Sequence, residues 1–255
     1  MDSIYPPNFA RFYDPIYSKI LSGADSVFYL KKASEANGAV LEAGSGTGRF
    51  FIDALNQGTN IYGIDISPSM IDILKTKINK EQHHRVSVQN ILDFSFDHQF
   101  KLILAPFRVF MHLTEVSDQL KALNNIYNQL LPGGEFIFDL FIPDPNIIAN
   151  GITESVDFEG EYMPGEKLRR ITNAKYDLVN QIAHVKMRFE WTENKILNEE
   201  TWDTSLRLFF RFELEHLLFR SQFKDYSIFG DFNEKELCKE SKEFVVICRK
   251  GLEER

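Results

Sequence analysis

The sequence predicts an α/β protein with a doubly wound, mostly parallel sheet that is interrupted by an antiparallel β insert. Two observations carry this prediction. Between residues 39 and 141, short apolar runs alternate with longer helical patterns, which is typical of a parallel sheet covered by helices. After Pro143, strand-like segments follow one another without helices between them, which is typical of an antiparallel meander.

The first half of the chain supplies five of the expected strands. A glycine-rich run, Gly44–Gly48, directly follows the first strand. Ser67 and Pro68 have the residue types of a helix N-cap and a first helical position. The run Leu131-Pro-Gly-Gly134 ends a later helix. The predicted strands cover residues 39–42, 61–65, 85–89, 100–105 and 135–141, and the predicted helices begin at Arg49, Pro68 and Thr114.

The second half changes from helical spacing to strict alternation. Along residues 179–192 the apolar side chains Ala183, Val185, Met187, Phe189 and Trp191 share one face. We expect insert strands at residues 166–176, 179–192 and 198–211, then a helix from Phe212 and strands at 225–229 and 243–249. Residues 1–150 and 212–255 would thus form one domain with a seven-stranded sheet, and residues 151–211 the insert.

Composition excludes several classes of protein. The 255 residues hold 29 Lys and Arg against 37 Asp and Glu, a net charge of −8, which disfavours nucleic-acid or membrane-surface partners. The N-terminus lacks the pattern of a signal peptide, and no apolar run is long enough to span a bilayer. The 2 Cys fit a reducing compartment, and no cluster has metal-ligand spacing, so we expect a cytoplasmic protein without a metal.

The most informative segment is the turn after the first strand. Glycines at 44, 46 and 48 bring bare backbone next to a ligand at the carboxyl end of the sheet. Asp65 ends the next strand, where a carboxylate can accept both hydroxyls of a ribose. A dinucleotide site favours G-x-G-x-x-G, but the spacing here is G-x-G-x-G. Glu42 would repel a pyrophosphate and suits an ammonium, so a nucleoside with an amino-acid tail fits better.

These residues resemble the class I S-adenosylmethionine-dependent methyltransferases. The match is best to a small-molecule branch with a β insert, which includes sugar N-methyltransferases. The matching segments are Glu42-x-Gly-x-Gly-x-Gly48, Gly63–Met70, Phe100–Ala105 and Leu131–Gly134. The resemblance implies a Rossmann-like sheet, S-adenosylmethionine as the cofactor and a small molecule as the methyl acceptor.

The resemblance also implies which residues contact the cofactor. Glu42 and the backbone of Gly44–Gly48 would hold the methionyl portion, and Asp65 the ribose. Ile66 and Met70 would lie beside the adenine. Further contacts are expected at Tyr13, Ser45, Gly46, Asn90, Ile91 and Ala105.

Asn90 stands where the family usually has an acid that accepts a hydrogen bond from the adenine amino group. Its carbonyl oxygen can still accept that bond, but without charge assistance. We therefore expect the contact to be kept and weakened. Asp93 is a second candidate for the same role.

Two residues after the fourth strand are candidates for chemistry. His112 is our first choice for a base, because histidine titrates nearest neutral pH. Its structural alternative is packing against the helix that begins at Thr114. Arg108 could bind an acidic group of the acceptor, and its alternative is an ion pair with a neighbouring acid.

Near the N-terminus, Tyr13-Asp-Pro-Ile-Tyr17 resembles a Tyr-Asp-x-x-Tyr segment that folds over the cofactor in the family. Tyr17 and Tyr13 would then contact the acceptor or the methionyl carboxylate. The alternative is an amphipathic helix whose Phe12, Ile16 and Ile20 pack on the protein. The cofactor contact and the amphipathic packing are compatible if they use different faces of the helix.

The sequence therefore predicts an S-adenosylmethionine-dependent methyltransferase that modifies an N or O atom of a small molecule. A nicotinamide-dependent oxidoreductase and a non-catalytic S-adenosylmethionine-binding protein are the alternatives. The apolar face of the insert makes a homodimer plausible, and a lid over the acceptor is its other use.

Overall fold

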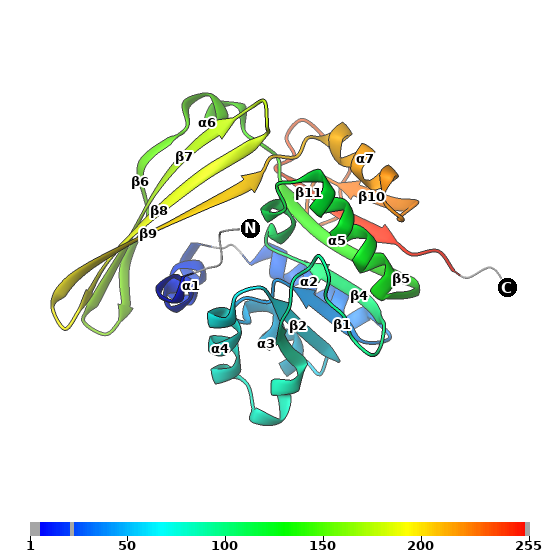
Figure 1. The fold of residues 1–255 in the computed structure, drawn as a ribbon, viewed down its shortest axis with the longest axis horizontal. Coiled ribbons are helices and arrows are strands. Elements are labelled where there is room, and N and C mark those ends of the chain that lie inside the picture. The colour runs from blue at the N-terminus through cyan, green and yellow to red at the C-terminus, as the bar shows by residue number, and fades with distance from the viewer. Residues whose placement is uncertain (1–5, 21–22, 253–255) are drawn as a thin grey trace. The chain divides into compact units, whose positions relative to one another are not determined.

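The computed structural model describes residues 6–20 and 23–252, and these residues form two compact units (Figure 1). The larger unit contains residues 23–142 and the chain from residue 209 onward. The smaller unit contains the N-terminal helix α1 (Pro7–Ile20) and residues 143–208. The sequence predicted this helix as part of the domain of residues 1–150 and 212–255, but it belongs to the smaller unit.

The larger unit is built on the expected seven-stranded sheet, with strand order β10-β11-β5-β4-β1-β2-β3. The strands from β5 to β3 pair in parallel, and β11 is antiparallel to β5, so the sheet is mostly parallel. The strands are β1 (Val40–Ala43), β2 (Ile61–Asp65), β3 (Val86–Val88), β4 (Phe100–Ala105), β5 (Leu130–Phe141), β10 (Asp225–Phe229) and β11 (Glu243–Arg249). This is the predicted Rossmann-like arrangement.

Helices cover this sheet. The longest, α5, runs along β5 in Figure 1. Ser67 caps α4 by accepting a hydrogen bond from the Met70 amide, and Pro68 occupies its first turn, as the sequence predicted. The helices of this unit are α2 (Ala24–Glu35), α3 (Arg49–Asn56), α4 (Pro68–Lys77), α5 (Val116–Gln129) and α7 (Arg211–Arg220), with 3-10 turns η1 (Lys80–Arg85) and η2 (Val109–His112).

Two features of the larger unit were not predicted. Helix α2 was missed, because its apolar residues Val27–Leu30 are consecutive and give no helical stripe. Strand β5 begins at Leu130 and not at Glu135, since the Pro-Gly-Gly run lies inside the strand at an irregular pairing with β4.

The smaller unit is a four-stranded antiparallel sheet with strand order β6-β7-β8-β9. Its strands are β6 (Ile152–Met163), β7 (Glu166–Asp177), β8 (Ile182–Glu193) and β9 (Ile196–Arg207), and a short helix α6 (Pro145–Asn150) precedes them. The prediction of three strands was wrong, because β6 is mostly exposed and three register shifts disturb its alternation. The last insert strand was also expected to reach residue 211, but β9 ends at Arg207.

Helix α1 packs on this four-stranded sheet through its apolar stripe. Phe12 is fully buried, with its ring centroid 5.2 Å from that of Trp191 and 5.0 Å from that of Tyr162. Phe9 and Ile16 are buried beside it. The predicted amphipathic helix is therefore present, although the side chain of Ile20 lies outside the described residues.

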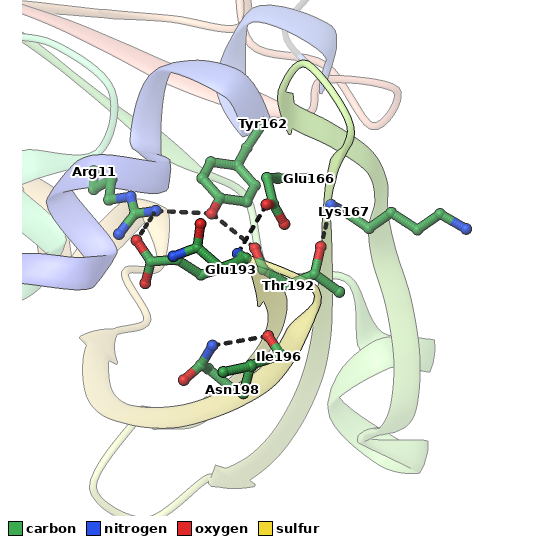
Figure 2. A network of polar contacts seen from close by, with 9 residues as sticks. Arg11, Tyr162, Glu166, Lys167, Thr192, Glu193, Ile196 and Asn198 are labelled. Atoms are coloured by element: carbon green, nitrogen blue, oxygen red, sulfur yellow. Dashed lines mark hydrogen bonds and ion pairs between the residues drawn. The ribbon is translucent and has the colours of Figure 1, made fainter.

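Polar contacts fix the helix in this position (Figure 2). The Arg11 guanidinium donates to the Tyr162 hydroxyl at 2.7 Å and pairs with Glu193 at 3.2 Å. Tyr162 in turn donates to the Thr192 carbonyl at 2.9 Å. The helix is thus attached to the ends of both hairpins of the sheet.

No helix of the described residues is long and apolar enough to cross a membrane.

We expect Phe12→Ala to lower the free energy of unfolding by about 3–5 kcal/mol, since it removes a fully buried aromatic ring. Chemical denaturation monitored by tryptophan fluorescence measures this change. Ser18→Ala, at an exposed position of the same helix, is the control and should change stability by less than about 0.5 kcal/mol. Equal effects of the two variants would contradict the packing of α1.

Candidate functional site

The glycine turn after β1 folds back over the end of β2. The amides of Gly44 and Ser45 both donate to the Ile64 carbonyl, at 2.7 and 2.9 Å. Gly44, Gly46 and Gly48 all have positive φ. A Cβ on Gly44 would collide with Val109, whereas a Cβ on Gly46 would meet open space. The turn is therefore packed on one side and leaves the backbone of Gly46 accessible to a ligand.

Glu42 is buried at the end of β1, with 1% of its surface exposed. Its Oε2 atom has no hydrogen-bond partner among residues 6–20 and 23–252. Burial raises the pKa of this carboxyl well above its usual range, although Arg49 and the Phe51 amide oppose the shift. A buried carboxylate oxygen without a donor is costly, and a cation or hydrogen-bond donor from a ligand would remove that cost.

Asp65 lies beside this turn at the end of β2. Its Oδ2 accepts a hydrogen bond from the Gly46 amide at 2.9 Å, and its Oδ1 accepts one from the Ser67 amide at 2.8 Å. Burial raises the pKa of Asp65, and these two hydrogen bonds oppose the shift. The carboxylate is thus held rigidly at the same turn as Gly46.

Glu42 and Asp65 are close neighbours, as their strands imply. Strands β1 and β2 pair in parallel, with Glu42 opposite Gly63. The charge of Asp65 contributes to the raised pKa of Glu42. The structure therefore brings together the two acids that the sequence singled out, together with the three glycines between them.

The residues expected beside an adenine lie around the ends of β2 and β3. Ile66 is exposed directly after Asp65, while Met70 is buried on α4. The side-chain oxygen of Asn90 accepts a hydrogen bond from the Leu92 amide at 3.0 Å, so it already shapes its own turn. Asp93, the second candidate, is exposed and pairs with Lys121. Ile91 is half-buried in the turn after Asn90, and Ala105 is fully buried at the end of β4.

The turn after β4 carries His112 and has a strained backbone. Phe107 and Arg108 have φ of 60° and 66°, a left-handed conformation that costs about 1–3 kcal/mol for each non-glycine residue. His112 ends the 3-10 turn η2 that follows. Burial lowers the pKa of His112 to about 4, so its imidazole is neutral at physiological pH.

Arg108 forms an ion pair in the structure. Its guanidinium donates to Glu243 on β11 at 2.6 Å. Burial raises the pKa of Glu243 to about 7, and the charge of Arg108 opposes this shift. The ion-pair alternative from the sequence is therefore present, and recognition of an acidic acceptor by Arg108 stays a prediction.

Sequence reasoning missed a buried pair behind this turn. The Tyr29 hydroxyl on α2 donates to Asp139 on β5 at 2.6 Å, and the Phe107 amide donates to the same carboxylate oxygen at 2.8 Å. The available signal was Asp139 itself, because it is a single charge within the apolar run Phe136–Phe141.

Tyr13 and Tyr17 lie on α1, in the smaller unit. Their ring centroids are 4.4 Å apart, and the Tyr17 hydroxyl accepts a hydrogen bond from the buried Arg170 at 3.2 Å. This contact holds Tyr17 on β7 of the four-stranded sheet. Contact of either tyrosine with a cofactor or an acceptor stays a prediction.

Comparison with known proteins finds a similar family for part of the larger unit. Residues 40–134 match the family model of the methyltransferase domain. This part of the chain is therefore similar to methyltransferase domains. This segment runs from β1 through the start of β5 and contains Glu42, the glycine turn, Asp65 and His112.

A curated relative and two solved structures are similar over longer stretches. Malonyl-[acyl-carrier protein] O-methyltransferase 2 of Ilyobacter polytropus is 28% identical over 164 residues, which are 61% of each chain. The CcbJ methyltransferase of Streptomyces caelestis has a TM-score of 0.79 at 19% identity, covering 98% of this chain and 99% of that one. CalS10 of Micromonospora echinaspora, an amino pentose methyltransferase solved with bound S-adenosylmethionine, has a TM-score of 0.69 at 15% identity, covering 98% of this chain and 100% of that one.

The alignments with curated relatives cover between 41% and 61% of those relatives' lengths. The structural similarity covers nearly the whole chain, the β insert included. Both units therefore share their fold with methyltransferases. The sequence identity is too low to transfer the acceptor of those enzymes to this chain.

The residues of the larger unit fit the cofactor of this family. The unpaired oxygen of Glu42 can accept from an ammonium, and Gly46 leaves open space at the turn. Asp65 keeps lone pairs for ribose hydroxyls, because each of its oxygens accepts one amide.

We expect the imidazole of His112 to titrate with a pKa of about 4, because burial disfavours its charged form. The side chain should therefore stay neutral from about pH 8 down to about pH 5. An NMR titration of the histidine ring protons measures this, with His112→Asn used to assign the resonance. A titration of His112 near neutral pH would contradict the burial that the structure gives it.

Proposed function

We propose that the whole chain is an S-adenosylmethionine-dependent methyltransferase that acts on an N or O atom of a small molecule. The observation that supports this most directly is the unpaired, buried Oε2 of Glu42, beside the open backbone of Gly46 and the fixed carboxylate of Asp65. Within a methyltransferase fold, these groups match an ammonium, a methionyl chain and a ribose.

In this proposal Glu42 accepts from the ammonium of the methionyl portion, and the backbone of Gly44–Gly48 lies along it. Asp65 accepts from the ribose hydroxyls. Ile66 and Met70 flank the adenine, and the amide of Asn90 makes a weaker contact than an acid would. S-adenosylmethionine supplies an electrophilic methyl group on its sulfur. The chain contributes alignment of the acceptor with that group and exclusion of water, which are large terms in a displacement reaction.

The chemistry of His112 favours a nitrogen acceptor over an oxygen one. Methylation of a hydroxyl needs a base that removes its proton, whereas an amine needs only to be unprotonated. With a pKa of about 4, His112 is a weak base but a good hydrogen-bond acceptor. It can therefore orient an N–H of the acceptor so that the nitrogen lone pair faces the methyl group.

The similar proteins include an O-methyltransferase, the curated relative from Ilyobacter polytropus, and a sugar N-methyltransferase, KedS8, which supports this preference. DesVI of Streptomyces venezuelae shares the fold at a TM-score of 0.74, and KedS8 from a Streptoalloteichus species, a sugar N-methyltransferase, shares it at 0.72. Their sequence identity to this chain is 14%. We therefore propose an amine on a polar small molecule, with amino sugars as the first class to test.

Two alternatives remain distinct from this proposal. A nicotinamide-dependent oxidoreductase would place a pyrophosphate beside the buried carboxyl of Glu42, which is electrostatically unfavourable. A non-catalytic binding protein would keep Glu42 and Asp65 but transfer no methyl group.

A homodimer and a lid formed by the insert stay predictions, which sedimentation and a structure with bound ligand would test.

The proposed function is tested by calorimetry and by a panel of acceptors. We expect binding of S-adenosylhomocysteine and no binding of NADH. With S-adenosylmethionine, we expect methylation of at least one amino sugar and none of its matched hydroxyl sugar. Binding of NADH without binding of S-adenosylhomocysteine would contradict the proposal, and binding without turnover on any amine or hydroxyl would favour the non-catalytic alternative.

We expect Glu42→Gln to weaken the binding of S-adenosylhomocysteine by about 10- to 100-fold, because it removes a buried, charge-assisted hydrogen bond. The wild-type protein should also release a proton on binding. Burial keeps the pKa of Glu42 high when the site is empty, and a neighbouring ammonium lowers it. Affinity should therefore fall as the pH drops below the raised pKa of Glu42.

Calorimetry in two buffers with different ionisation enthalpies measures both quantities. Glu42→Gln should abolish the proton release. Glu115→Gln changes an exposed acid in the same way and should leave both affinity and proton release unchanged. Proton release that persists in Glu42→Gln would show that another group titrates.

A further inference from the structure

The turn after β4 is held in place by groups that the proposed function does not use. It begins with two consecutive non-glycine residues in the left-handed region, Phe107 and Arg108. Four residues after Arg108 it presents His112. Val109 of the same turn packs against Gly44, and a Cβ on Gly44 would collide with the side chain of Val109. The position of this turn therefore affects both His112 and the glycine turn of the cofactor site.

Asp139 holds the backbone of this turn at Phe107, the first of the two residues with positive φ. One oxygen, Oδ1, accepts both the Phe107 amide at 2.8 Å and the Tyr29 hydroxyl at 2.6 Å. Asp139 is 1% exposed and Tyr29 is fully buried. Without Asp139, the Phe107 amide and the Tyr29 hydroxyl would lose this acceptor in a buried environment, where an unpaired donor is costly.

Two further contacts act on the same residues. The Arg49 guanidinium carbon lies 3.4 Å from the centroid of the Phe107 ring, and Arg49 pairs with Asp25 at 3.6 Å. Arg108 pairs with Glu243. The amide of Phe107, its ring and the side chain of Arg108 are thus each held by a different element of the larger unit.

We infer that Asp139 is a positioning residue: together with Tyr29 it fixes the turn of residues 106–112, and through that turn it sets the place of His112. The inference rests on the proposed role of His112 toward the acceptor. Asp139 and Tyr29 act on the turn and touch no reacting atom.

The charge of Asp139 is part of this arrangement. Burial raises the pKa of Asp139, while the Tyr29 hydroxyl, the charge of Arg108 and the Phe107 amide oppose the shift, and Asp25 reinforces it. The charge of Asp139 also raises the pKa of Glu243, so these two acids interact. Ionised Asp139 accepts both hydrogen bonds, and Asn at this position keeps a carbonyl oxygen that can accept them without the charge.

The experiment compares Asp139→Ala, Asp139→Asn and Tyr29→Phe with the wild-type protein. Amide hydrogen exchange of residues 107–112 and the pKa of His112 by NMR are the primary measurements. Neither needs a known acceptor. Affinity for S-adenosylhomocysteine is measured on the same samples. Tyr127→Phe on α5 and Asp225→Ala on β10 are matched controls that remove the same groups elsewhere in the unit.

We expect Asp139→Ala to accelerate exchange in the turn by at least about tenfold and to move the pKa of His112 from about 4 toward about 6.5, because the turn opens and His112 gains water. Asp139→Asn should keep most of the protection. Tyr29→Phe should give a smaller change at the same residues. The controls should leave both the turn and the affinity for S-adenosylhomocysteine unchanged. Asp139→Ala should also weaken that affinity, because Val109 of the opened turn packs against Gly44.

The inference is overturned if exchange in the turn and the pKa of His112 stay as in the wild type in both Asp139→Ala and Tyr29→Phe. It is also overturned if exchange accelerates equally over the whole sheet, since that is a general loss of stability. If Asp139→Ala does not fold, Tyr29→Phe decides by the same criteria. A wild-type protein that fails to bind S-adenosylhomocysteine refutes the proposed function and leaves these measurements interpretable.

Discussion

The candidate site depends on one incompletely paired group, the buried carboxyl of Glu42. Its Oε2 has no hydrogen-bond partner in the described residues, and Asp65 adds a second acid beside it. A buried carboxylate oxygen without a partner is unfavourable, and a cation of a ligand would remove that cost. The three glycines matter because they let a ligand reach this carboxyl. The fold provides the rest, since parallel pairing of β1 and β2 puts both acids at one edge.

The larger unit could be predicted from sequence because its signals are local and repeated. Buried parallel strands give short apolar runs, and Ser67-Pro68 begins a helix in the usual way. Glu42, Gly46 and Asp65 were found because each lies at the end of such a strand or in the turn that follows it. Their roles toward a cofactor still come from the family, because geometry alone shows only that an ammonium and a ribose fit.

The missed features depend on pairings between distant residues. Strand β6 is mostly exposed and its pairing with β7 shifts register three times, so its own residues give no regular alternation. Tyr29 and Asp139 are 110 positions apart, and nothing local links a tyrosine on α2 to an acid on β5. The conformation of Phe107 and Arg108 was equally hidden, since neither residue type favours positive φ. Arg108 was predicted with two alternatives, and only its partner Glu243 favours one of them.

The smaller unit joins two segments of the chain that are separated by the first five strands of the larger sheet. Helix α1 precedes these strands in the chain, yet its Phe9 packs on Trp202 of β9, which ends at Arg207. During synthesis the apolar stripe of α1 therefore stays unburied until most of the polypeptide has left the ribosome. Contacts of such long sequence separation also form slowly. A nascent chain stopped before β9 would expose that stripe to chaperones, so binding of a chaperone to stalled chains of increasing length would follow the completion of this sheet.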